Sequence, residues 1–364
     1  MSKFRTLLTQ LIWLLPAPAF AQELPGTGTD AAAEAAHAWT WFGDLMLRGD
    51  RVTGIPRPVD PSFTRYFGRG RFGVLFDPIP ALQFGAAIKL ADASNPNSDD
   101  RRNNHNERSN DAALDQAFLR WNLGETASLL LGKAEFPLQL SPLLWDQDLR
   151  PIGASFNAST AVGEFDRLQF IGGYFAGNLM YGDDSRIGAV QGAYQWHEGA
   201  PVNGSVVVSY LDFSDLRQLT VQGLSRTNRR VGPVLVSDYR LLDLQFVGRT
   251  QAWSKPLELR LDLVRNLGAD DQRDGARVSA VLGDSRNVQG WEFGLAGQRL
   301  GRDAAMAAFN SDDWWFHSWA RGVMPWVAYG FDAVWSARLA GFHERRDGVD
   351  EYTDRILVDI FARW

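Results

Sequence analysis

Apolar and polar side chains alternate along most of this chain from residue 39 onward. In residues 257–263, the four leucines at odd positions alternate with Glu258, Arg260 and Asp262. Residues 82–90 and 291–296 show the same alternation. Successive side chains of a β-strand point to opposite faces, so the pattern predicts many strands with one apolar and one more polar face. A water-soluble β-sandwich would show the same alternation.

The last twelve residues, 353–364, show the pattern most completely. Ile356, Val358, Ile360, Ala362 and the terminal Trp364 share one face, and the other face carries charged residues at 355, 359 and 363. A final strand of this kind resembles the closing strand of an outer-membrane β-barrel, in which the terminal aromatic residue also serves as an assembly signal. Because lipid tolerates no open sheet edge, we expect this strand to pair with residues 39–48.

Short turns and longer polar connections follow one another in turn along the chain. In bacterial barrels, short turns face the periplasm and longer loops face the outside. The seven turns and eight loops expected here would separate about sixteen strands, including a weakly marked one at 152–159. Turns are expected at 77–80, 124–126, 161–164, 197–202, 251–256, 285–289 and 327–330, and loops at 49–63, 92–111, 136–150, 177–185, 214–236, 268–274, 301–313 and 343–352.

Tryptophans lie mainly near the ends of the predicted strands. Aromatic residues concentrate at this level in membrane barrels, where they form belts at the two interfaces. The tryptophans assigned to such belts are Trp39, Trp41, Trp121, Trp253, Trp314, Trp315, Trp319, Trp326 and Trp364. Their position favours a membrane barrel over a soluble all-β fold.

The amino terminus predicts export from the cytoplasm. Lys3 and Arg5 precede an apolar stretch at 7–15, and Ala19-Phe20-Ala21 has the small-x-small pattern of a cleavage site. We therefore expect a signal peptide at 1–21, a periplasmic tail at 22–38 and a transmembrane barrel at 39–364. The chain has 364 residues, no cysteine and a net charge of -6 without a block of one sign, which argues against nucleic acid as a partner.

Four short motifs resemble the putative porin family of the outer membrane. They are GDLMLR at 43–48, LGK at 131–133, LWDQDLRPIG at 144–153 and GWEFGL at 290–295. The resemblance implies a single-chain barrel of about sixteen antiparallel strands in the bacterial outer membrane. It also implies contact with lipid and lipopolysaccharide, and passage of small hydrophilic solutes or ions. A homotrimer is one assembly that it implies, although several loops predicted here are shorter than in typical trimeric porins.

Charged residues are expected to line the lumen if the apolar faces meet lipid. Alternation places arginines from three neighbouring strands on one wall, and Arg260 and Asp262 also point inward. Rows of arginine opposite acids bias ion selectivity in pores. The 136–150 loop contains apolar residues that are costly in an exposed loop, so we expect it to fold into the lumen and bring Asp146 and Asp148 toward Arg69 and Arg71. The wall arginines are Arg48, Arg65, Arg69, Arg71 and Arg120.

Three other motifs suggest different chemistry and are weaker. The GRGRFG match to a dinucleotide-binding motif at 68–73 has no following helix. The GADDQRDG stretch at 268–275 resembles the start of a calcium loop, but Val281 stands where the terminal glutamate is expected. His317 and Ser318, if adjacent on a strand, would point to opposite faces. We therefore expect no catalytic residue, cofactor or metal. The alternatives are an outer-membrane enzyme of the phospholipase or protease type with residues at its rim, and a non-conducting barrel that acts as a scaffold.

Overall fold

The computed structural model describes residues 38–57, 61–94, 106 and 111–364. The expected signal peptide and almost all of the expected tail lie outside these residues. The described chain is almost entirely β-structure, and its helices α2 (Asn178–Tyr181) and α3 (Arg217–Val221) are short. No helix among the described residues is long and apolar enough to cross a bilayer.

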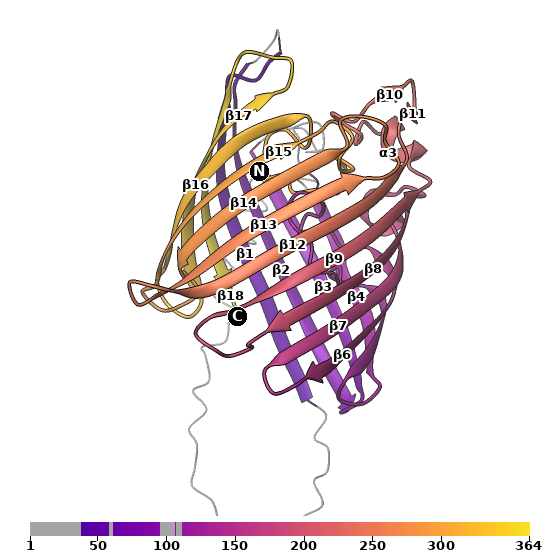
Figure 1. Ribbon diagram of the computed structural model, residues 1–364, viewed down its shortest axis with the longest axis vertical. Coiled ribbons are helices and arrows are strands. Elements are labelled where there is room, and N and C mark those ends of the chain that lie inside the picture. The colour runs from indigo at the N-terminus through magenta and orange to yellow at the C-terminus, as the bar shows by residue number, and fades with distance from the viewer. Residues whose placement is uncertain (1–37, 58–60, 95–105, 107–110) are drawn as a thin grey trace, which may run out of the picture. The chain divides into compact units, whose positions relative to one another are not determined.

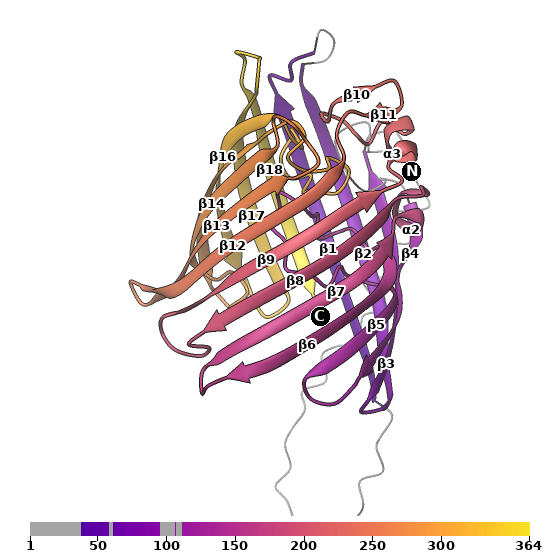
Figure 2. The same ribbon diagram turned by 45° about the vertical axis from the view of Figure 1, so that its right-hand side comes forward.

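Sixteen strands form one closed antiparallel barrel, so the predicted fold class is confirmed. Figures 1 and 2 show the tilted strands around the barrel wall. A separate two-stranded hairpin, β10 (Arg230–Val231) and β11 (Val234–Leu235), lies in a loop. The barrel strands are β1 (Ala38–Thr53), β2 (Phe63–Ile79), β3 (Leu82–Ala93), β4 (Asp111–Asn122), β5 (Ala127–Lys133), β6 (Ile152–Val162), β7 (Asp166–Ala176), β8 (Arg186–Trp196), β9 (Asn203–Ser214), β12 (Tyr239–Ala252), β13 (Lys255–Asn266), β14 (Asp274–Gly283), β15 (Trp291–Leu300), β16 (Ala320–Gly330), β17 (Trp335–Arg346) and β18 (Thr353–Arg363).

The first and last strands close the barrel as the terminal pattern predicts. Arg48 lies opposite Asp359, and Leu45 lies opposite Ala362. The Trp364 and Gly43 backbones exchange two hydrogen bonds of 3.2 Å each. Closure leaves neither strand with a free edge, as a barrel in lipid requires.

Alternation separates an outer apolar face from an inner polar face on each strand. On β18, Ile356 and Val358 are each 50% exposed on the outside, whereas Arg355 and Asp359 are buried on the inside. An apolar face that remains exposed around the wall is what lipid would cover. The weakly marked strand expected at 152–159 is present as β6.

The turn expected at 327–330 and the loop expected at 301–313 are wrong. Residues 327–330 belong to β16, and the turn lies at 331–334. The loop expected at 301–313 continues to 319, so Trp314 and Trp315 are not interfacial residues but are buried, each 4% exposed. His317 and Ser318 also lie in this loop rather than on a strand. In the sequence alone, tryptophans that pack inside the barrel cannot be told from tryptophans of an interfacial belt.

Loops 134–151, 215–238 and 301–319 supply most of the barrel's largest apolar core. Leu143, Leu144 and Trp145 pack with Met306 and Phe309, and all five are buried. The Trp145 and Phe309 rings are stacked, with centroids 5.6 Å apart and an interplanar angle of 4°. The core also includes wall residues such as Phe175 and Leu211. It therefore fixes the 134–151 and 301–319 loops to the inside of the barrel.

Candidate functional site

The 134–151 loop crosses the lumen between opposite parts of the wall. On one side, the Gln139 carbonyl accepts hydrogen bonds from Gln191 on β8 and Gln245 on β12, of 2.9 and 2.8 Å. On the other side, Asp148 meets arginines of β2. The prediction that this loop folds inward agrees with its geometry, because its leucines and tryptophan are buried in the loop core.

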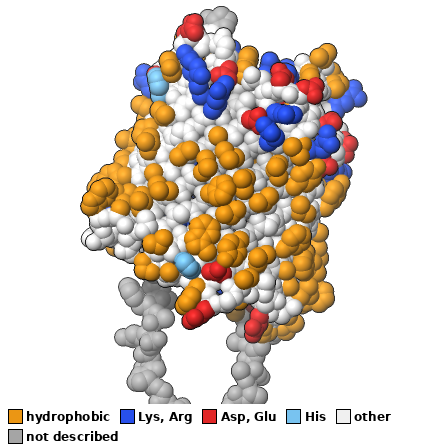
Figure 3. All heavy atoms as spheres, in the orientation of Figure 1, with side chains coloured by type: hydrophobic (Ala, Val, Ile, Leu, Met, Phe, Trp, Pro, Cys, Tyr) orange, Lys and Arg blue, Asp and Glu red, His pale blue; other side chains and the backbone are white. Residues whose placement is uncertain are grey.

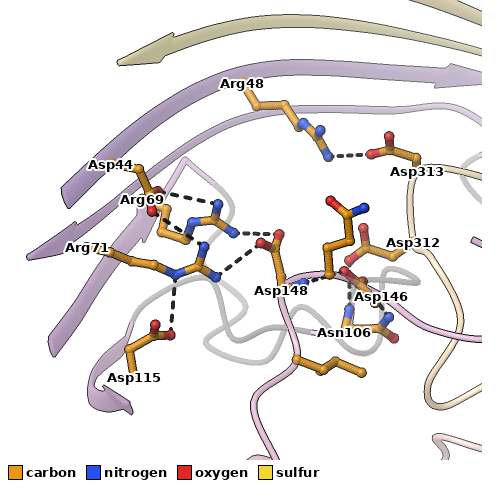
Figure 4. A network of polar contacts seen from close by, with 12 residues as sticks. Asp44, Arg48, Arg69, Arg71, Asn106, Asp115, Asp146, Asp148, Asp312 and Asp313 are labelled. Carbon is orange, nitrogen blue, oxygen red and sulfur yellow. Dashed lines mark hydrogen bonds and ion pairs between the residues drawn. The ribbon is translucent and has the colours of Figure 1, made fainter. Parts of the chain in front are cut away.

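Asp148 faces the arginine wall as expected. Its carboxylate lies 2.5 Å from Arg69 and 3.1 Å from Arg71. From the wall side, Asp44 lies near both guanidinium groups and Asp115 pairs with Arg71 (Figure 4). Burial raises the pKa of Asp148, but Arg69 and Arg71 outweigh it and hold that pKa below its usual range. Asp148 therefore carries a stable negative charge, and its 31% exposure leaves the charge in contact with the lumen.

The 301–319 loop supplies a second acid to the same wall. Asp313 lies 3.0 Å from Arg48 on β1 and 3.0 Å from Arg338 on β17. Both arginines also bind Asp359 on β18. Arg355 donates to the backbone carbonyl of Asp313 at 2.7 Å and so holds the loop backbone as well. Burial raises the pKa of Asp313, but Arg338 and Arg48 bring it below its usual range.

Asp146 lies at the contact between the two loops rather than at the arginine wall. Its carboxylate accepts hydrogen bonds from Asn106 at 2.7 Å and from the Asp148 backbone at 2.9 Å, and its own backbone donates to Phe309. Burial, together with the nearby charges of Asp312 and Asp148, raises the pKa of Asp146 well above its usual range. The expectation that Asp146 faces Arg69 and Arg71 is therefore wrong, because hydrogen bonds hold its carboxylate on Asn106 and on the backbone of its own loop.

The remaining predicted lumenal residues lie outside this wall cluster. Arg65 points inward but is fully buried, 3.6 Å from Asp50. Arg120 lies beside Gln83, close to the 123–126 turn, with a hydrogen bond of 3.1 Å. Arg260 and Asp262 form an ion pair of 2.7 Å on β13. Arg260 also bonds Gln245, which holds the Gln139 end of the crossing loop.

Several residues of the site were missed by sequence reasoning. Asp312 and Asp313 were not singled out because the 301–319 loop was expected to be shorter and external, and Arg338, which lies on β17, was not assigned to the lumen. The apolar run AAMAAF at 304–309, followed by WWF at 314–316, indicates a loop that folds inward. The apolar content that predicted an inward 136–150 loop applies equally to this stretch. Among the described residues, no group of acids and histidines could hold a metal ion.

The constriction is defined here by Asp148 and Asp313 on the two loops and by Arg48, Arg69, Arg71 and Arg338 on the wall. Figure 4 shows the acids of the two loops approaching the arginines from the lumenal side. A closed barrel with inserted loops and paired charges at its inner wall has the architecture of a porin.

Comparison with known proteins agrees with this class. Residues 58–193 match the model of the family described as putative porin, which confirms the resemblance over that part of the chain. Comparison with curated proteins found no match. The family match over part of the chain and the shared fold agree with the porin architecture described above.

Solved porins share the fold at low sequence identity. The high-pH structure of Pseudomonas putida OprB is 12% identical with a TM-score of 0.60, over 90% of this chain and 94% of OprB. Salmonella typhi OmpF, in complex with daunomycin, is 11% identical with a TM-score of 0.55, over 91% and 98%. A triple mutant of Rhodopseudomonas blastica porin is 9% identical with a TM-score of 0.51, over 90% and 100%.

Proposed function

We propose that this chain is an outer-membrane porin through which small hydrophilic solutes or ions diffuse passively. The observation that carries the proposal is the constriction inside a closed sixteen-stranded barrel. A barrel of this strand number is too wide to be filled by the side chains of its wall alone. The two inserted loops narrow it, and their acids face arginines across the lumenal surface.

The proposed mechanism is a size limit combined with an electrostatic filter. Asp148 and Asp313 keep partial exposure, 31% and 23%, while each binds two wall arginines. Fixed charges of both signs beside a narrow aqueous path act on a passing ion at close range, where screening is weak. No bond is made or broken in the solute, so the residues need only hold their positions.

Planar-bilayer recording of the purified chain tests this function. We expect stepwise currents that rise linearly with voltage, and liposomes containing the chain should swell in small sugars faster than in large ones. A barrel that is folded on a gel but gives no current would overturn the proposal. Silence would favour the scaffold alternative, which the apolar core formed by the loops makes the nearest competitor. Lipid or peptide hydrolysis by a silent barrel would favour an enzyme.

The export signal is proposed from the sequence and has its own test. Cleavage after Ala21 predicts a mature amino terminus at Gln22. Amino-terminal sequencing of protein taken from the outer membrane would contradict this if residues 1–21 were retained. Native mass spectrometry of the same material decides between a single barrel and a homotrimer.

A further inference from the structure

Three arginines lie side by side on the outer face of the barrel. Arg299 on β15 is the cross-strand partner of Arg321 on β16, and Arg321 is the partner of Arg345 on β17. Alternation places all three outside, because Ala320 and Glu344 beside them point inward and are buried. Directly opposed side chains on neighbouring strands lie about 5 Å apart at Cβ.

The row has few acidic partners within the barrel. Arg299 reaches Asp347 only at 4.0 Å, and Arg345 lies over the Tyr352 ring at 5.3 Å. Across residues 38–57, 61–94, 106 and 111–364, no carboxylate forms an ion pair with Arg321 or Arg345. Like charges that oppose each other on adjacent strands destabilise a sheet. An anion bound across the row would remove that repulsion.

The row lies at the edge of the lipid-facing surface. On the same three strands and the same outer face, Leu295, Val323 and Leu339 are 56%, 47% and 49% exposed. Figure 3 shows Lys and Arg side chains gathered near the top of this view, above the hydrophobic side chains. The row is at the end of the strands that carries the long loops, which faces outward in barrels of this class.

We infer that Arg299, Arg321 and Arg345 bind the phosphate groups of a phosphorylated lipid of the outer leaflet, such as the lipid A part of lipopolysaccharide. The inference rests on the proposed outer-membrane location. Guanidinium groups bind phosphate oxygens through two parallel hydrogen bonds. Three of them in a row suit a headgroup with more than one phosphate, and the apolar residues below would contact its acyl chains.

Nearby charges set the strength of the site. His343 and Asp354 occupy the next outer row toward the apolar surface, and they are joined at 2.7 Å. Asp347 is the acid that pairs with Arg299, at 4.0 Å. Within the part of the chain that the structure describes, Asp354 pairs with His343, and Asp347 forms an ion pair with Arg299 alone. The row therefore keeps a net positive charge toward the headgroup region.

A lipid-binding experiment tests the inference on the full mature chain. Protein purified in detergent and freed of lipid is titrated with lipid A, and binding is counted by native mass spectrometry. The test variant is Arg299→Ser/Arg321→Ser/Arg345→Ser. The control, Arg217→Ser/Arg230→Ser/Arg286→Ser, removes the same charge from exposed positions in α3, β10 and a short turn. We expect lipid A to bind the test variant about a hundredfold more weakly and the control almost unchanged.

Further measurements separate the possible outcomes. Equal loss in both variants, or equal retention in both, would overturn the lipid site. The lipid site would also be overturned if inorganic phosphate bound the wild type as well as lipid A does at the same phosphate concentration. Conductance measured on the same preparations separates this site from the pore: the test variant should conduct as the wild type does. A wild type without current that still binds lipid A would count against the porin function alone.

Discussion

The Arg48 guanidinium on β1 lies 3.0 Å from the Asp313 carboxylate on the 301–319 loop. The same guanidinium lies 2.7 Å from Asp359 on β18. One arginine therefore joins an inserted loop to the two strands that close the barrel. Buried charges of this kind are stable only when each keeps its partners, so loss of one partner should destabilise the remaining charges.

Asp313→Asn tests this connection. The variant leaves Arg48 and Arg338 with less negative charge nearby and weakens the hold on the loop by about 1–3 kcal/mol. We expect a shift of the reversal potential toward anions and noisier single-channel currents. Asp212→Asn, which removes an exposed acid from β9, is the control and should leave both unchanged. An unaltered reversal potential in the Asp313 variant would argue that the path avoids this residue.

Asp148→Asn should shift ion selectivity toward anions over a wide pH range. Arg69 and Arg71 hold the pKa of Asp148 below its usual range. A carboxyl with a lowered pKa stays charged even when the pH is below the ordinary pKa of aspartate. Its contribution disappears only as the pH falls through the lowered pKa. The reversal-potential difference between wild type and variant should therefore be constant from pH 8 to about 4. A difference that faded between pH 7 and 5 would contradict the assignment.

Asp146→Asn should show the opposite pH dependence. Burial and the nearby acids raise the pKa of Asp146, so its proton is retained at a pH where an ordinary aspartate has lost it. Its charge appears only as pH rises through the raised pKa. We expect wild type and variant to have nearly the same selectivity at low pH and to diverge as the pH is raised. A constant difference over that range would show that Asp146 is ionised throughout.

The barrel was predictable from the sequence because lipid and water impose a period of two on every strand. That period assigns Arg48, Arg69 and Arg71 to the inside, and closure through 353–364 follows from the absence of free edges. The inward fold of the 134–151 loop was predictable from the cost of exposing Leu143, Leu144 and Trp145.

The contacts between loops could not be predicted in the same way. Alternation says nothing about irregular segments, so the bond of Asp146 to Asn106 and the pairing of Asp313 with Arg338 depend on how loops pack against distant parts of the chain. Aromatic content was misleading at Trp314 and Trp315, because buried and interfacial tryptophans are alike in sequence. Alternation also does not show at which level of the barrel an inward side chain lies. Arg65 and Arg120 both point inward, but Arg65 is buried beside Asp50 and Arg120 lies near a short turn.

Phe309→Ala should loosen both inserted loops. Phe309 is fully buried and stacks on Trp145 across the contact between them. Truncation of a buried phenylalanine costs about 3–5 kcal/mol. The cavity would be lined by Trp145 of the other loop, by Tyr181 of α2 and by Phe213 of β9. We expect faster hydrogen exchange in 134–151 and 301–319, with the strands still protected. Phe293→Ala on the outer face of β15 is the control, since this side chain is 49% exposed. Equal exchange in both variants would show that Phe309 does not couple the loops.

Gly43→Ala should weaken barrel closure, because the terminal tryptophan packs directly on this glycine. A Cβ at position 43 would lie 2.5 Å from the Trp364 ring and 2.8 Å from the Arg71 carbonyl, whereas a Cβ at Gly49 on the same strand meets nothing nearer than 3.9 Å. Added atoms in a packed site cost about 1–3 kcal/mol. Gly43→Ala should therefore lower the temperature at which the folded band disappears on a gel, and Gly49→Ala should leave it nearly unchanged. If the two variants melted together, the contact of Trp364 with Gly43 would not contribute to holding β1 against β18.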